Sequence, residues 1–139
     1  MLEIDGIPPR FANQVCEEVL CQQYRYRGRL QQEVDMLLLK VNGHWHQLYF
    51  DSGIVFWRLQ DEAPKAVEAR PGDPLTYPLI DVGKTYALKQ SVISDCITEP
   101  YVGGARVLFV FEEKGSLIVM HNDNTTSLRF IKSLQQQQL

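Results

Sequence analysis

Hydrophobic residues in the first half of the chain form three short runs, which two turn signals separate. The runs cover residues 34–41, 44–50 and 54–59, and each is rich in the β-branched and aromatic residues that strands favour. Asn42-Gly43 joins the first two runs and suits the positive φ angles of a type I′ hairpin turn. Asp51-Ser52-Gly53 provides a second tight turn. The pattern predicts an antiparallel meander of three strands.

The first of these strands carries apolar side chains on both faces. Because side chains alternate along a strand, Met36 and Leu38 point to one face, while Leu37, Leu39 and Val41 point to the other. A strand that is apolar on both faces is normally covered on both sides. We therefore expect the rest of the chain to pack against both faces of the meander.

A helix-like pattern precedes the meander. Six apolar positions recur at a spacing that would place them on one stripe of a helix: Phe11, Ala12, Val15, Cys16, Val19 and Leu20. Pro8-Pro9 stands where proline is tolerated in a first helical turn. The sequence predicts a helix from about Pro9 to Gln23 that covers one face of the sheet.

The segment from Gln60 to Pro74 lacks regular apolar periodicity and contains three prolines and a glycine. It predicts a long loop, with one short turn of helix around residues 63–69. Loops of this length in compact domains are often functional. Two interpretations are open at this point, an element that contacts a partner and a connection that only crosses between two parts of the sheet.

The second half of the chain predicts another set of short strands, at residues 75–80, 86–97, 105–111, 117–121 and 126–131. Together the elements predict an α+β fold. In it an N-terminal helix packs on a curled antiparallel sheet or half-barrel of about seven to eight strands. Residues 1–134 would form a single domain, and residues 135–139 a polar flexible tail.

Composition narrows the class of protein. The chain has 139 residues with 45% hydrophobic and 22% charged residues and a net charge of −3, as expected of a globular domain. No apolar run reaches about 18 residues, and the N-terminus has no signal-peptide pattern, so we expect no membrane partner. Three cysteines, Cys16, Cys21 and Cys96, are an odd number without metal-type spacing, which indicates free thiols and a cytoplasmic location.

Aromatic residues and arginines alternate in Tyr24-Arg25-Tyr26-Arg27-Gly28-Arg29. Such alternation would suit a single-stranded nucleic acid, which needs stacking surfaces and phosphate contacts. The acidic chain as a whole argues against a nucleic-acid partner. We expect instead that these arginines lie on the solvated face of an edge strand and pair with Glu33 and Asp35.

His44-Trp45-His46 places two imidazoles on one face of a strand, about 7 Å apart. This is the spacing of His-x-His pairs in metal sites, and His121 could complete such a site. The chain contains no phosphate loop, nucleophile elbow or Cys-x-x-Cys motif, so we predict no enzyme activity and no cofactor. The metal set of His44, His46 and His121 is kept as an alternative.

The favoured hypothesis is a small acidic module that binds a protein. Partner contacts are expected from acidic residues of the long loop and from an aromatic–arginine pair next to it: Asp61, Glu62, Glu68, Asp73, Trp57 and Arg58. In size, charge and expected architecture the chain resembles immunity proteins, which neutralise bacterial toxins by direct binding, and a basic toxin domain would be its partner. The alternatives are a β-barrel-like enzyme or metal- or small-ligand-binding protein that uses His44 and His46, and a subunit of a homo-oligomer.

Overall fold

The computed structural model describes residues 2–66 and 70–133, and within them the chain is built almost entirely of strands. The strands are β1 (Glu3–Asp5), β2 (Gln14–Tyr26), β3 (Arg29–Val41), β4 (His44–Asp51), β5 (Ile54–Gln60), β6 (Leu75–Thr76), β7 (Leu79–Asp81), β8 (Ser91–Tyr101), β9 (Gly104–Phe111), β10 (Gly115–Asn122) and β11 (Thr125–Lys132). One short helix, α1 (Val82–Thr85), lies between β7 and β8. No helix in the described ranges is long and apolar enough to cross a membrane.

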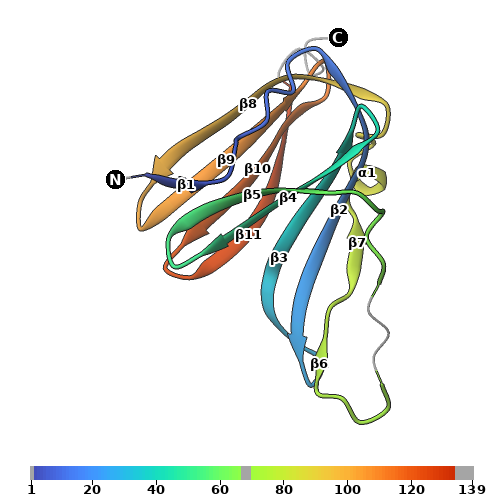
Figure 1. Cartoon of the computed structure of the whole chain (residues 1–139), viewed down its shortest axis with the longest axis vertical. Coiled ribbons are helices and arrows are strands. Elements are labelled where there is room, and N and C mark those ends of the chain that lie inside the picture. The colour runs from blue at the N-terminus through green and yellow to red at the C-terminus, as the bar shows by residue number, and fades with distance from the viewer. Residues whose placement is uncertain (1, 67–69, 134–139) are drawn as a thin grey trace.

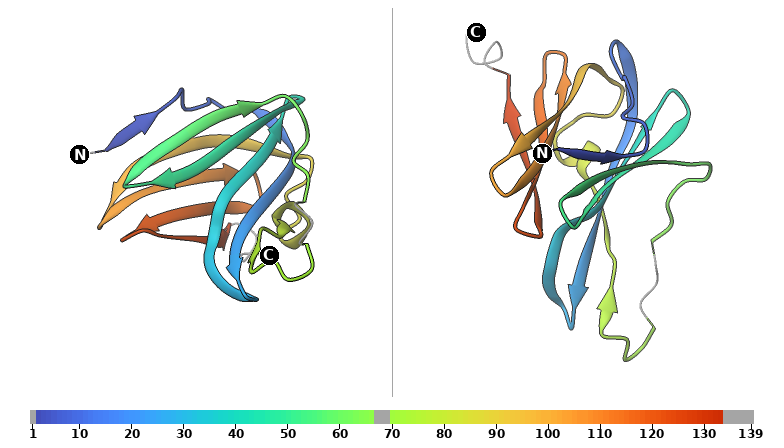
Figure 2. Two further views of the ribbon diagram at one scale, coloured as in Figure 1. Left: turned by 60° about the horizontal axis from the view of Figure 1, so that its bottom comes forward. Right: turned by 60° about the vertical axis from the view of Figure 1, so that its left-hand side comes forward.

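All eleven strands belong to one sheet with the order β1-β5-β4-β3-β2-β8-β9-β10-β11, and β6 and β7 also pair with β2. Neighbouring strands are antiparallel except β1, which runs parallel to β5. The strands curve around a common interior, as the two views in Figure 2 show. The β2–β3 hairpin is long enough to extend beyond the other strands, with β6 beside its end (Figure 1).

The curled sheet is closed by a side chain that bridges two distant strands. The Gln32 side-chain amide donates to the Asn124 carbonyl oxygen at 3.0 Å, and its oxygen accepts from the Thr126 backbone N–H at 2.6 Å. This contact holds the outer half of β3 against the start of β11. The interior is filled by fully buried apolar residues from almost every strand, among them Val19, Leu37, Leu39, Leu48, Trp57, Val107, Phe109, Leu117 and Val119.

The predicted meander is confirmed. Asn42 and Gly43 have φ angles of 52° and 78°, and Val41 pairs with His44, as in a two-residue type I′ turn. Ser52 and Gly53 form the second turn with φ angles of 51° and 78°. Both faces of the meander are covered, since Leu38 and Trp45 are buried on the face opposite the core.

The predicted α+β fold with an N-terminal helix over Pro9 to Gln23 is wrong, since residues 14–26 form strand β2. A β-bulge explains the misleading pattern. Cys16 pairs with Val41 and Glu18 with Lys40, so that one extra residue stands between them. The bulge moves the next inward position by one, and the buried residues Cys16 and Val19 are three apart, as on a helix. Val15, which the helical stripe would bury, is 41% exposed.

In the second half of the chain, the prediction is confirmed for β9, β10 and β11. The structure differs from the prediction in the segment from β6 to β8. The expected strand over residues 75–80 is divided into β6 and β7 by the segment that contains Pro78, and β8 begins only at Ser91. Between them, Asp81 caps the start of α1, where its carboxylate accepts from the Lys84 N–H at 3.0 Å. The sheet therefore has more strands than the expected seven to eight, and it is mixed because β1 is parallel.

Shortening a side chain on the inner face of the sheet should destabilise the protein more than shortening an exposed side chain. Leu37 is completely buried, so Leu37→Ala should lower the free energy of unfolding by about 2–5 kcal/mol in urea denaturation. Leu59→Ala is the matched control, because this side chain is 71% exposed; its effect should stay below about 1 kcal/mol. Equal effects of the two variants would show that the inner face is not the core.

Candidate ligand-binding hollow

The N-terminal segment crosses the edge of the core as a strap, which we define as residues 6–11. β1 pairs with the start of β5, and Gly6 then turns the chain inward with a φ of 95°. A Cβ atom at Gly6 would lie 2.1 Å from the Trp57 carbonyl oxygen, so only glycine fits this close approach. The strap ends at Phe11, which is buried in the core. Its far end is thereby anchored by apolar packing.

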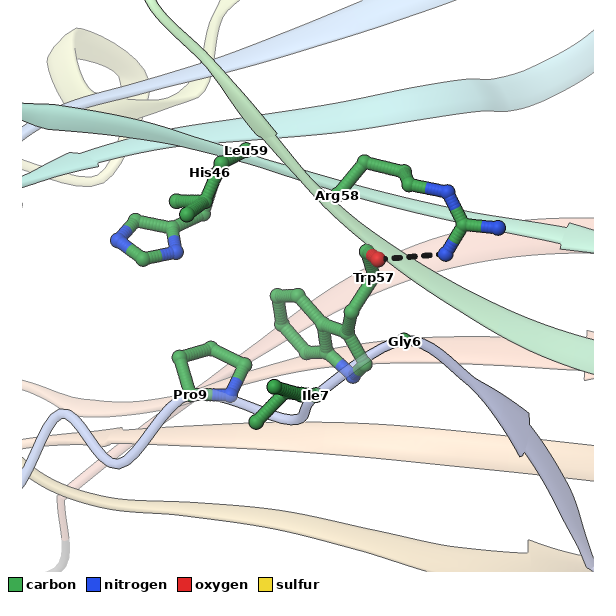
Figure 3. Close-up of a pocket in the computed structure, with 7 residues that line it drawn as sticks. All are labelled: Gly6, Ile7, Pro9, His46, Trp57, Arg58 and Leu59. Atoms are coloured by element: carbon green, nitrogen blue, oxygen red, sulfur yellow. Dashed lines mark hydrogen bonds between the residues drawn. The ribbon is translucent and has the colours of Figure 1, made fainter.

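A hollow of about 440 Å³ lies between the strap and strands β4 and β5. Figure 3 shows its walls, with Gly6, Ile7 and Pro9 on the strap side and His46, Trp57, Arg58 and Leu59 on the strand side. Most of this lining is apolar. Ile7 is 88% and Leu59 71% exposed, so two large aliphatic side chains stand in solvent at its rim. The volume falls in the range of small-molecule sites.

Trp57 lines the hollow and also belongs to the core. The residue is 2% exposed, and its ring packs edge-on against Phe11 at 6.3 Å and Phe109 at 6.2 Å between ring centroids. The indole N–H is buried and has no hydrogen-bond partner among the described residues. In Figure 3 this nitrogen lies beside Ile7. The predicted role of Trp57 as a surface anchor for a protein partner would therefore require access through the hollow.

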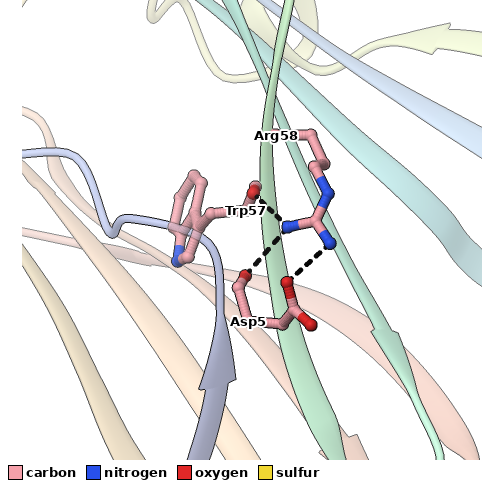
Figure 4. A network of polar contacts seen from close by, with 3 residues as sticks. All are labelled: Asp5, Trp57 and Arg58. Carbon is pink, nitrogen blue, oxygen red and sulfur yellow. Dashed lines mark hydrogen bonds and ion pairs between the residues drawn. The ribbon is translucent and has the colours of Figure 1, made fainter.

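Arg58 ties the end of β1, just before the strap, to β5. Its guanidinium donates to the Asp5 carboxylate at 2.6 Å, to the Asp5 carbonyl oxygen at 3.2 Å and to the Trp57 carbonyl oxygen at 2.8 Å (Figure 4). The guanidinium also lies 5.5 Å from the centre of the Phe56 ring. These contacts occupy the guanidinium group. Arg58 therefore contributes mainly the aliphatic part of its side chain to the wall of the hollow.

His46 is the polar group of the hollow. Its ring packs edge-on against Phe11 with 4.9 Å between centroids, and its strand neighbour on β5 is Leu59. Burial, and then the neighbouring charge of His44, lowers the pKa of His46 below its ordinary value of 6.5. At neutral pH the imidazole is uncharged. One ring nitrogen then donates a hydrogen bond and the other accepts one.

The three histidines of the alternative metal set are not gathered into one site. His44 and His46 share a face, as predicted, but His44 is exposed. His121 is buried elsewhere, with Nδ1 at 2.9 Å from the Thr126 hydroxyl and its ring stacked on Phe50 at 5.1 Å. In the described part of the chain, no cluster of three or more His, Cys, Asp or Glu could hold a metal ion.

The acidic residues predicted to contact a partner lie at opposite ends of the β5–β6 connection. Asp61 and Glu62 are exposed and follow Leu59 closely in the chain, near the rim of the hollow. Asp73 is exposed next to β6, where its carboxylate accepts from the Leu75 N–H at 3.0 Å. Glu68 lies outside the described residues. The expected helical turn around 63–69 is not seen in residues 63–66, and 67–69 are likewise not described.

Sequence reasoning missed the strap, because it assigned the start of the chain to a lead-in for a helix. The signal was Gly6 followed by Ile7-Pro8-Pro9. A glycine and two successive prolines suit an extended crossing segment that donates no strand hydrogen bonds. Its contact partner, β5, is about fifty residues away in the chain, so the hollow between them depends on tertiary structure.

Acid should destabilise the fold through His46. Because its folded-state pKa is lowered, the unfolded chain takes up a proton first as pH falls. The free energy of unfolding should therefore be constant above the ordinary pKa of about 6.5 and decrease below it until the folded-state pKa is reached. His46→Gln should reduce the loss measured by urea denaturation between about pH 7.5 and 5.5.

His121, whose pKa burial also lowers, leaves a residual slope in that variant. An NMR titration that places the pKa of His46 at or above its ordinary value would contradict this account, as would an unchanged slope.

Comparison with known proteins assigns no activity to this geometry. We find no protein-family model that matches the chain, and no curated protein or solved structure with significant similarity to it.

Proposed function

We propose that this chain is a non-catalytic binding protein whose hollow takes a small, uncharged ligand with a flat apolar ring. The observation that carries the proposal is the exposure of Ile7 and Leu59 beside an apolar hollow with a buried tryptophan in its wall. A ligand that covers large exposed aliphatic side chains removes their surface from water, and this favours binding. Pro9 offers a flat apolar surface that suits a ring, while the buried Trp57 bounds the hollow on its core side.

The polar groups around the hollow define the charge of the ligand. His46 is neutral at physiological pH and can make one hydrogen bond to a hydroxyl, carbonyl or ring nitrogen. Arg58 is engaged by Asp5, which leaves no free positive charge on the wall to attract an anion. A ligand with one polar group and no net charge fits this lining best.

The residues around the hollow do not form a reacting set. Among the described residues, its lining contains one imidazole and no cysteine, serine or carboxylate that could act with it. The three cysteines are free, and burial raises the pKa of each thiol to about 12, so they are poor nucleophiles at neutral pH. Free thiols also support our proposal of a cytoplasmic location.

The neutral fluorophore N-phenyl-1-naphthylamine tests the ligand proposal. Its emission should rise when it enters the hollow, and the emission of Trp57 should be quenched in parallel. Ile7→Ser/Leu59→Ser removes the aliphatic rim and should weaken binding about tenfold in a fluorescence titration.

The matched control for that titration is Val102→Ser/Ile131→Ser, which removes two exposed aliphatic side chains from other parts of the surface. It should bind the probe as the wild type does. No binding by the wild type, or equal loss in both double variants, would refute the site.

A protein partner is the second candidate function. Asp61 and Glu62 are exposed beyond the rim, and neither carboxylate holds an ion pair within the described residues. A partner could insert an apolar side chain between Ile7 and Leu59 while its basic residues meet these carboxylates. A toxin domain with a basic surface would have this chemistry, and the protein would then act as its inhibitor.

Charge reversal tests that second candidate against a partner captured from native lysate. Asp61→Lys/Glu62→Lys should slow association about tenfold at low salt, because the carboxylates steer the encounter. Glu3→Lys/Glu112→Lys carries the same change of charge at two other exposed positions and should associate at a rate close to that of the wild type. Equal rates for the two variants would exclude a specific contact with Asp61 and Glu62.

A further inference from the structure

Arginines gather at the protruding end of the β2–β3 hairpin, and we call this surface the arginine tip. It consists of Arg25, Arg27 and Arg29 on the hairpin and Arg70 on the adjoining turn. Tyr26 pairs with Leu75 of β6, the Arg27 N–H donates to the Pro74 carbonyl oxygen at 2.7 Å, and the Asp73 N–H donates to the Arg70 carbonyl oxygen at 2.9 Å. These contacts join hairpin and turn at the lower end of the molecule in Figure 1.

The arginine tip is a positive pole on an acidic protein. Residues 24–32 and 70–77 contain four arginines and one acid, Asp73, while the rest of the chain contains ten cationic and sixteen acidic residues. The expected pairing of these arginines with Glu33 and Asp35 is wrong, since Asp35 accepts from the Gln22 amide at 2.8 Å. No arginine of the tip forms an ion pair in the described ranges.

Apolar side chains lie among these charges. Tyr26, Leu30 and Leu75 are all exposed. The strand register places Leu30 opposite Arg25 on one face of the hairpin end, and Tyr26 between Arg29 and Leu75 on the other face. Exposed apolar side chains at the same hairpin end as several arginines fit an interface that has phosphates at its surface and hydrocarbon just below. Arginine is the cation best suited to hold phosphate oxygens, because it can donate two parallel hydrogen bonds.

The aromatic rings of the tip are not free to stack on nucleic-acid bases. Tyr24 and Tyr77 stack on each other with 5.4 Å between centroids, and the Arg27 guanidinium lies 5.4 Å from the Tyr26 ring centre. Sites for single strands also follow grooves, whereas this surface is a protruding hairpin end (Figure 1). Shape and stacking both favour a flat anionic surface over a nucleic acid.

We propose that the arginine tip docks the protein reversibly on an anionic phospholipid membrane. The guanidinium groups bind lipid phosphates, and Leu30, Leu75 and Tyr26 enter the boundary between headgroups and acyl chains. The acidic remainder of the chain is repelled by the same surface and turns the tip toward it. This proposal departs from our sequence-based expectation of no membrane partner. That expectation rested on the lack of a spanning segment and of a targeting signal.

Vesicle co-sedimentation tests the proposal with the full chain. The wild type should bind vesicles of phosphatidylcholine that contain about 30% phosphatidylserine, and it should not bind vesicles of pure phosphatidylcholine. About 1 M salt should release the bound protein. Arg29→Glu/Arg70→Glu should weaken binding at least about tenfold. Neither side chain makes a hydrogen bond or ion pair within the described chain, so the fold should persist; circular dichroism checks this.

The matched control is Arg129→Glu/Lys132→Glu, which changes the net charge equally at two exposed positions on β11. It should retain most of the binding. Leu30→Ser/Leu75→Ser should weaken binding about threefold and leave the salt release unchanged. Three outcomes would overturn the proposal: no binding to anionic vesicles, equal loss in both charge variants, or tip-dependent binding to a single-stranded oligonucleotide that exceeds binding to vesicles.

Discussion

A sheet with one strongly apolar face and no long helix to cover it has to bury that face against itself. This constraint explains most of the described structure. Strands from both halves of the chain curve until Leu37 and Leu48 on one side share an interior with Phe109 and Leu117 on the other. The Gln32 side chain holds the curl closed where backbone pairing stops, by satisfying two backbone groups at the start of β11.

The strap completes this interior and leaves the hollow as a consequence. Phe11 fills space that the strands leave open, and Gly6 allows the chain to pass close to the Trp57 carbonyl oxygen. Between these two fixed points, two successive prolines restrict the backbone of the segment. The hollow therefore has one wall of paired strands and one wall formed by the strap, which follows the Asp5 residue that Arg58 binds.

The outer end of the β2–β3 hairpin protrudes beyond the core and does not contribute to it. Its residues can carry charge, and the arginines at its end are separated from the acids that dominate the rest of the chain. The hollow belongs to β4, β5 and the strap, away from this end (Figure 1). A protein docked by its hairpin would keep the hollow open to solvent, so the two proposed surfaces can act independently.

Sequence by itself determined the local elements whose physics is local. Asn42-Gly43 specified its turn because few residue pairs accept two positive φ angles, and alternation along residues 34–41 specified cover on both faces. Tertiary structure decided the rest. A bulge at Glu17 gave a strand the apolar spacing of a helix, and pairing with β3 and β8 determined which structure formed. The candidate site likewise joins Ile7 and Pro9 to His46 and Trp57, and such a meeting depends on the path of the whole chain through space.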